Sequence, residues 1–531
     1  VAGLGQLSAT DNHTEARGSS IVTINQPSDL EDNEFFFWGH DSAGLVEQSA
    51  EVPPSFDATG GVRYAQEWRV DISGGDNSIG TIDLTFDISG GGLGTDPTLY
   101  RLLIDTDGDF EDATVDPTLP NLAGNSVTFV GVSIDDNDFF TLGNTNDIDD
   151  CSSLTTGDWY PVTWDCAKTP DSLSNVFILT GTTVTVTSDT IRSARDLDVE
   201  GVLQLNNDAT LIVKGNITID PGASFIFGDN ASLILRGTNG TQTVSNQSGD
   251  TIEFENILID NSNDVTLNDG VFSIADGLTL TKGKLTVNDN LLFLSTATQT
   301  AHINAIPNGS IVDGPGTISV DRFRSARNTN WGNIASSGVI TDLEDLNGEV
   351  LMSGIPGGNG YAGGNGGGAN GGAAFTSVWY YDNITDQYDS PSNTNDPFTI
   401  GQGFEIWLGD NINTWNGQAW NLEGELHLDN ISLDMNSAGG GWNLFGNPYL
   451  GFLDWDQITS DFGNISNNEF WYVDANLGAF VNVTTGGTTI PPGQGFWVNA
   501  TSNADLDLDP SLHLASGVSD PTFLKRRNID Q

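Results

Sequence analysis

The run Asp105-Thr106-Asp107-Gly108-Asp109-Phe110-Glu111-Asp112 holds the residue types best suited to metal chemistry. Carboxylates at alternate positions around a glycine turn can wrap a hard cation, because Ca²⁺ takes about 6–8 oxygen ligands in irregular geometry. The run is not an EF-hand, since its glycine is at the fourth place and no glutamate stands at the twelfth. An acidic hairpin turn accounts for the same residues, with Asp and Gly present for backbone reasons. We therefore weigh a calcium site formed by Asp105, Asp107, Asp109 and Asp112 against a polar turn.

The two cysteines, Cys151 and Cys166, suggest a covalent cross-link. Their spacing fits no zinc motif, because zinc sites need four ligands with short internal spacings. In an oxidising compartment the pair would close a loop that stabilises the fold by ~3 kcal/mol. Two unpaired buried thiols are the alternative. We expect the disulfide, because the rest of the composition is typical of an extracellular protein.

Tryptophans are concentrated in the C-terminal part of the chain, where exposed rings could stack on sugars. They are Trp331, Trp379, Trp407, Trp415, Trp420, Trp442, Trp455, Trp471 and Trp497. Aromatic residues at equivalent positions of an internal repeat are expected in the core. These pairs are Trp379 with Trp471 and Phe404 with Phe496. Trp415 and Trp420 lack such partners and lie in or just beyond an Asn/Gly-rich loop, so they are the expected ligand-binding residues.

No recognisable catalytic motif is present. The histidines stand alone in their segments, and the sequence contains no H-E-x-x-H and no G-x-S-x-G. A polysaccharide lyase would need basic residues, which are few in residues 151–324, and carboxylate pairs for hydrolysis cannot be singled out where most turns carry Asp. We therefore expect no enzymatic activity, with a polysaccharide lyase or hydrolase as the alternative.

Charge excludes several functions for this chain of 531 residues, whose formal net charge is −55. Nucleic-acid binding depends on clustered Lys and Arg, and only 17 such residues oppose 72 Asp and Glu. No apolar stretch approaches the ~20 residues that span a bilayer, so membrane insertion is not expected. The 26 Phe, 13 Trp and 9 Tyr are enough to bury a core, which argues against disorder.

Short alternating apolar runs bounded by Asn, Asp and Gly predict an all-β chain. Residues 1–150 are expected to form an antiparallel β-sandwich. In residues 151–324, apolar pairs recur every six to eight positions, and three steps add up to 20–22 residues. The first pairs are Leu197/Val199, Leu203/Leu205, Leu211/Val213, Ile217/Ile219, Phe225/Phe227 and Leu233/Leu235. This rhythm predicts a right-handed parallel β-helix, with a sandwich of very short strands as the alternative.

Residues 325–515 contain an internal repeat. Trp379-Tyr380-Tyr381-Asp382 aligns with Trp471-Tyr472-Val473-Asp474, and Gly401-Gln402-Gly403-Phe404 with Gly493-Gln494-Gly495-Phe496, both at an offset of 92. Upstream, Trp331 aligns with Trp442 at an offset of 111. The difference is close to the length of a Gly/Asn-rich stretch at 357–374, which we interpret as a flexible insertion. Two related jelly-roll-like β-modules are predicted, followed by a linker or tail at 516–531.

Several of these motifs resemble modules of large surface proteins from gliding Bacteroidota. Glu67-Trp68-Arg69-Val70 and Asp138-Phe139-Phe140-Thr141-Leu142 are similar to a β-sandwich module, Gly157-Asp158-Trp159 to the entry into a β-helix, and residues 442–448 and 491–498 to the module that follows. In that family such modules precede a C-terminal sorting domain read by the type IX secretion system. The resemblance implies export as type IX cargo and carries no catalytic residues.

These features together predict a non-enzymatic extracellular or cell-surface protein with a structural or adhesive role. Its expected partners are the secretion machinery or a surface anchor, and a glycan or neighbouring subunits. The alternative is a carbohydrate-binding or polysaccharide-degrading β-helix protein.

Overall fold

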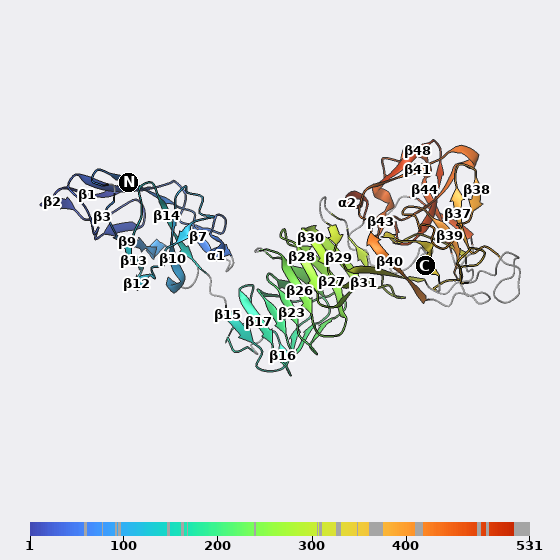
Figure 1. Ribbon diagram of the computed structural model, residues 1–531, viewed down its shortest axis with the longest axis horizontal. Coiled ribbons are helices and arrows are strands. Elements are labelled where there is room, and N and C mark those ends of the chain that lie inside the picture. The colour runs from blue at the N-terminus through green and yellow to red at the C-terminus, as the bar shows by residue number, and fades with distance from the viewer. Residues whose placement is uncertain are drawn as a thin grey trace, which may run out of the picture. The chain divides into compact units, whose positions relative to one another are not determined.

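The computed structural model is nearly all β and divides into two compact units, Val1–Asp149 and Asp150–Gln531 (Figure 1). The structure describes residues 1–514 except 58–60, 77, 91–92, 94–96, 146–148, 161–163, 167, 238–239, 305, 307–310, 325–330, 348, 360–374, 409–417, 475–478 and 485–487. The predicted tail at 516–531, Trp415 and most of the predicted insertion lie outside the described residues. Within the described ranges, no helix has the length and apolar character needed to cross a membrane.

The first unit is the predicted β-sandwich of two antiparallel sheets. The larger sheet has the order β11 (Thr114–Val115), β10 (Tyr100–Asp105), β14 (Phe139–Asn144), β8 (Trp68–Ser73), β5 (Glu34–His40), β1 (Ala2–Ser8) and β2 (Asp11–His13), with β6 (Glu47–Gln48) and β7 (Val62–Tyr64) beside β14. The smaller sheet has the order β12 (Asn121–Ala123), β13 (Ser126–Val132), β9 (Ile82–Asp87), β4 (Val22–Asn25) and β3 (Glu15–Arg17). A short helix, α1 (Pro54–Asp57), precedes β7.

Side chains that point alternately inward and outward along each strand form the core of the sandwich. In β8 every second side chain is buried, so Trp68 faces inward while Arg69 faces solvent. The Trp68 ring stacks on Phe140 at 5.8 Å between centroids and meets the edge of Phe86 at 5.6 Å. Because Trp68 and Phe140 belong to one sheet and Phe86 to the other, these rings hold the two layers together.

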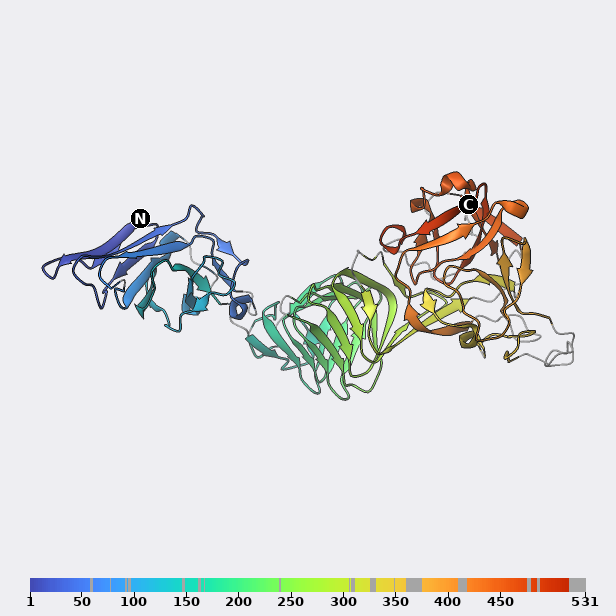
Figure 2. The same ribbon diagram turned by 45° about the horizontal axis from the view of Figure 1, so that its top comes forward.

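The second unit begins with the predicted parallel β-helix (Figure 2). One face is β15 (Asp149–Ser152), β17 (Ser174–Ile178), β20 (Leu197–Val199), β23 (Ile217–Ile219), β26 (Gln242–Asn246), β28 (Val265–Asn268), β30 (Lys284–Val287) and β33 (Ile311–Asp313). A second is β16 (Gly157–Asp158), β18 (Thr183–Val186), β21 (Val202–Leu205) and β24 (Ser224–Phe227). The third runs β19 (Ile191–Ala194), β22 (Thr210–Val213), β25 (Ser232–Leu235), β27 (Ile252–Asp260), β29 (Val271–Lys282), β31 (Asn290–Phe293) and β34 (Thr317–Arg324), with β32 (His302–Ile303) beside β29.

Equivalent apolar residues of successive coils stack in register inside the β-helix. Val176 lies opposite Leu197, which lies opposite Ile217, so like side chains repeat after 20 or 21 positions. The predicted apolar pairs are buried, except that Phe227 is only partly so. Each coil exposes its inward face unless a neighbour covers it, so stacking supplies the core.

Asp and Asn residues occupy turns between the coils of the β-helix. Asp189, Asp208 and Asn230 occupy the same corner of three successive coils, between the second and third faces. Their φ angles are 58°, 60° and 57°, in the left-handed region that Asp and Asn tolerate better than most residues. Asn230 Nδ2 also donates to Asp208 Oδ1 at 2.6 Å, which links neighbouring coils through their turns.

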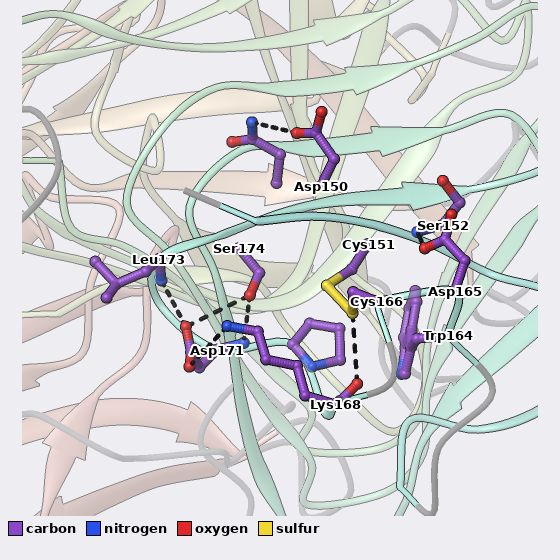
Figure 3. The surroundings of a disulfide bond; sticks show 12 residues. Asp150, Cys151, Ser152, Trp164, Asp165, Cys166, Lys168, Asp171, Leu173 and Ser174 are labelled. Carbon is purple, nitrogen blue, oxygen red and sulfur yellow. Dashed lines mark hydrogen bonds and ion pairs between the residues drawn. A yellow bond between two sulfur atoms is a disulfide. The ribbon is translucent and has the colours of Figure 1, made fainter. Parts of the chain in front are cut away.

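The disulfide covers the start of the β-helix (Figure 3). Cys151 and Cys166 form the predicted bond, with Cα atoms 5.0 Å apart. Within the enclosed loop, the rings of Trp159 and Trp164 meet at 5.0 Å and are both buried in the β-helix core. Asp165 Oδ1 accepts the N–H of Ser152 at 2.6 Å, tying the loop to the first strand. The loop thus closes an end that would otherwise expose apolar coil interior.

The last coil continues directly into the first C-terminal module. β34 pairs in parallel with β31 and in antiparallel with β40 (Gln418–Leu426), which pairs in turn with β36 (Val339–Ile340). One hydrophobic core extends from Cys151 to Leu450. The change from coils to antiparallel modules near residue 324 therefore takes place inside one compact unit.

The two C-terminal modules contain four-stranded antiparallel sheets of the same strand order. In the first module the order is β35 (Trp331–Ile334), β39 (Phe404–Trp407), β37 (Val378–Asp382) and β38 (Gln387–Asp389). In the second it is β42 (Trp442–Gly446), β47 (Gly495–Ala500), β44 (Ile465–Asp474) and β45 (Ala479–Val483). The second module also has the pairs β41 (Ile431–Met435) with β48 (Ala504–Leu508) and β43 (Leu453–Asp454) with β46 (Thr489–Ile490), and α2 (Pro510–His513) follows. Strands at offsets of 92 and 111 residues occupy equivalent places.

The modules contact one another reciprocally through the repeated Gly-Gln-Gly-Phe motif. Ala335 N–H donates to Gly493 O at 2.9 Å, and its repeat equivalent Gly446 N–H donates to Gly401 O at 2.8 Å. Gly401 and Gly493 have φ angles of 76° and 74° in turns closed by the N–H of the following glutamine. Such a turn needs a positive φ at its third position, which glycine adopts without strain. The repeated motif therefore forms the junction between the modules.

Shortening an inward-facing residue of the β-helix is expected to lower stability strongly. Leu233 on β25 is fully buried between Leu211 and Ile257, so Leu233→Ala should cost about 2–5 kcal/mol of unfolding free energy. The adjacent Ile234 points outward and is only partly buried, so Ile234→Ala is the matched control and should cost much less. Urea unfolding of the full chain measures both, and equal losses would contradict the assigned register.

Reducing the disulfide is expected to destabilise the second unit alone. The sequence separation of 15 between the two cysteines predicts a loss of ~3 kcal/mol for the double variant Cys151→Ser, Cys166→Ser. Calorimetry with and without a thiol reductant should show a lower melting temperature for the β-helix and an unchanged transition for the sandwich. A double variant that melts like the wild type would show that the cross-link does not stabilise this end.

Candidate ligand-binding groove

A groove lined by six aromatic residues lies where the two C-terminal modules meet. Its volume is about 360 Å³, and its lining residues are Tyr381, Tyr388, Trp442, Trp471, Phe480 and Trp497. The first two come from β37 and β38 of the first module, and the other four from β42, β44, β45 and β47 of the second. The groove therefore requires both modules.

Trp497 forms the floor of the groove. Its ring meets four of the others in near-perpendicular contacts, at 5.0 Å to Tyr381, 6.2 Å to Tyr388, 6.4 Å to Trp442 and 6.2 Å to Phe480. Trp471 joins the cluster through Trp442, with ring centroids 5.8 Å apart. Edge-to-face packing is favourable in itself and directs ring faces in several directions around one space.

The rim of the groove is solvent-exposed although its floor is not. Trp497 is 5% exposed, whereas Trp442, Tyr388 and Phe480 are 37%, 44% and 53% exposed. Large aromatic side chains left this accessible around a concavity are typical of a binding surface. The exposed members can also be truncated without opening the core.

Carboxylates surround the aromatic rings. The Tyr381 hydroxyl donates to Asp386, and burial together with this carboxylate raises the pKa of Tyr381 to about 12. Burial, followed by Glu405, raises the pKa of the Tyr388 hydroxyl as well. Glu469 accepts the Trp471 Nε1–H at 3.2 Å and an amide hydrogen of Asn482 at 2.8 Å. Three carboxylates therefore form hydrogen bonds with groove residues, and none of the described lining residues is cationic.

The repeat-based prediction for the core is right for one aromatic pair and wrong for the other. Phe404 and Phe496 are buried in the cores of their modules. Trp379 and Trp471 are instead half-buried on the outer faces of their sheets. Because Trp379, Tyr380 and Tyr381 are all aromatic, the sequence does not show which of them point inward. In the structure it is Tyr380 that packs against the core.

The sequence-based prediction of a sugar platform at Trp420 is also wrong. Trp420 lies on β40, a strand flanked by β34 and β36, and is 1% exposed in the core. Trp415 lies outside the described residues. The groove residues Tyr381, Tyr388 and Phe480 were not singled out from sequence, although Tyr388 and Phe480 occupy equivalent positions of the repeat.

The acidic loop of the first unit brings together three of its four predicted ligands. Carboxylate oxygens of Asp105, Asp107 and Asp112 lie within 4.8 Å of one another, while Asp109 is not part of this group. Asp105 is buried and Oδ1 accepts the Asp107 N–H at 2.9 Å, as in an acidic turn. The neighbouring Asp105 carboxylate, followed by burial and Asp107, raises the pKa of Asp112. Calcium binding here stays a prediction.

Comparison with known proteins gives one match, confined to the first unit. Residues 6–138 match a domain of unknown function, DUF8202. The matched part includes the acidic loop and most strands of both sheets, but not β14, and is well under half of the chain. No curated protein and no solved structure was found to be similar.

Calcium is expected to raise the melting temperature of the first unit if the carboxylates share an ion. At a concentration a hundred times Kd, linkage predicts about 2.7 kcal/mol of added stability. Asp107→Asn keeps the turn acceptor but removes one charge, so it should abolish the rise, whereas Asp109→Asn should retain it. Calorimetry in EDTA and in calcium chloride measures all three proteins, and an unchanged wild-type transition would remove the calcium site.

Proposed function

We propose that this chain is a non-enzymatic extracellular or cell-surface adhesion protein that binds neutral carbohydrate in the aromatic groove. The observation that carries the proposal is the cluster of six aromatic rings, three of them well exposed, around one concavity. A pyranose ring presents C–H groups with a slight positive charge, which pack favourably on electron-rich aromatic faces. The scaffold of sandwich and β-helix would carry this surface.

The negative charge near the groove and on the chain as a whole favours neutral glycans as ligands. Glu405, Asp386 and Glu469 form hydrogen bonds with groove residues, and the chain as a whole carries a net charge of −55. Anionic sugars would be repelled, and no described lining residue offers a positive charge to pair with them. Carboxylates do, however, accept hydrogen bonds from sugar hydroxyls. β-Linked glucans fit best, because their equatorial hydroxyls leave C–H groups on both ring faces.

The extracellular assignment is supported by the disulfide, since such bonds persist mainly in oxidising environments. Secretion as type IX cargo, with the secretion machinery or a surface anchor as partner, follows from the resemblance of the modules. Within this proposal the acidic turns keep long β-surfaces apart in solution.

One hollow in the β-helix favours polysaccharide cleavage as a second candidate function. It has a volume of about 360 Å³ and is lined by residues of three coils, including Asn175, Asp198 and Asn216. Burial, followed by Asp220 and Glu200, raises the pKa of Asp198, the direction expected of a general acid. The groove is the stronger candidate, because binding a ligand on its aromatic surface requires no catalytic residues.

Binding on a glycan array, followed by titration calorimetry, tests the proposal. The wild type is expected to bind neutral β-glucans and not oligogalacturonate. Trp442→Ala and Phe480→Ala should each weaken binding about fivefold, roughly 1 kcal/mol for one lost ring face. The matched control is Tyr160→Ala, because Tyr160 is also an exposed aromatic residue, at 61%, but lies in the disulfide-closed loop at the start of the β-helix.

Two results would count against the proposal. Absence of binding to every neutral glycan would remove the groove as a carbohydrate site. A reducing-sugar assay in which the wild type releases product and Asp198→Asn does not would favour the second candidate and contradict the non-enzymatic assignment.

A further inference from the structure

We infer that the groove is one end of a longer aromatic track, and that its ligand is therefore a glycan chain of several residues rather than a single sugar. This inference rests on the proposed function. It concerns the outer face of the four-stranded sheet in the first module, which leads away from the groove along β37 and β39. That face carries a second aromatic cluster made of Trp331, Phe375 and Trp407.

The second cluster repeats the geometry of the groove. The ring of Trp407 meets Trp331 at 5.6 Å and Phe375 at 5.3 Å, with interplanar angles of 75° and 73°. Phe375 is 37% exposed, and both tryptophans are half-buried. The opposite face of the same sheet is core, since Val378, Phe404 and Ile406 are buried. The cluster therefore faces solvent on the same side as the groove residues Tyr381 and Tyr388.

Strand register connects the two clusters in three rows. Trp331 lies opposite Trp407, Trp379 opposite Glu405, and Tyr381 opposite Tyr388. Along a strand, every second residue lies on the same face about 6.6 Å further on, so the outer rows are about 13 Å apart. A single pyranose cannot contact rows at both ends, whereas a chain can.

The middle row makes the track continuous and sets its chemistry. Trp379 is half-buried there and fixed by a hydrogen bond from its Nε1 to Thr376 O at 2.9 Å. Glu405 beside it forms a hydrogen bond with Tyr388, so it reaches the groove. In the second module the equivalent of Glu405 is Trp497, the groove floor. The first module therefore offers a carboxylate acceptor for sugar hydroxyls where the second offers a ring.

Chain-length dependence of binding tests the track. Titration calorimetry with cellobiose, cellohexaose, laminaribiose and laminarihexaose is expected to show tighter binding of a hexasaccharide than of its disaccharide. Phe375→Ala and Trp331→Ala should each weaken hexasaccharide binding about fivefold and leave disaccharide binding unchanged. Trp442→Ala, in the groove, should weaken both. Phe375 is exposed, so its truncation leaves the core intact.

The outcomes separate the two proposals. Equal affinity for di- and hexasaccharides, or hexasaccharide binding that neither Phe375→Ala nor Trp331→Ala weakens, would overturn the track while leaving the groove as a binding site. No binding of any of the four oligosaccharides, or binding that Trp442→Ala leaves intact, would overturn the groove itself and the track with it.

Discussion

The two ends of the β-helix have to be paired or covered, and the arrangement of the second unit follows from that constraint. A stack of β-coils leaves unpaired backbone groups and open apolar interior at both ends. At its start the loop closed by Cys151 and Cys166 places Trp159 and Trp164 against the interior. At its end β34 belongs both to the last coil and to the first module, so β40 satisfies the backbone groups that β34 would otherwise expose.

The binding surface depends on the same continuity. The first module and the β-helix share one hydrophobic core, which extends from Cys151 to Leu450. This shared core supports the sheet whose outer face carries the binding residues. The second module has a separate core around Trp455 and Phe496 and joins the first through the reciprocal Gly-Gln-Gly-Phe contacts. This junction brings Tyr381 of one copy beside Trp497 of the other. A duplicated fold thus yields a groove that neither copy forms alone.

The sequence predicted the architecture better than the site. Apolar pairs at short, regular steps identify β-helix coils because only inward positions need to be apolar, and the pairs from Leu197/Val199 onward lie where they were expected. Two cysteines in an acidic, turn-rich chain were enough to predict the disulfide. The side to which an aromatic residue points was harder to predict. In Trp379-Tyr380-Tyr381 all three residues are aromatic, so the sequence does not show which of them face the core. Trp420 is buried because its side chain packs in the core shared by the β-helix and the first module, an arrangement that depends on pairing between distant segments.

Hydrogen exchange of the full chain with and without cellohexaose, followed by mass spectrometry, tests the central claim that the module junction is the binding surface. The account predicts slower exchange in β37, β38, β44, β45 and β47, with the sandwich and the β-helix coils unchanged. Slower exchange in the coils around Asp198 with the modules unchanged, or no change anywhere at saturating sugar, would contradict it.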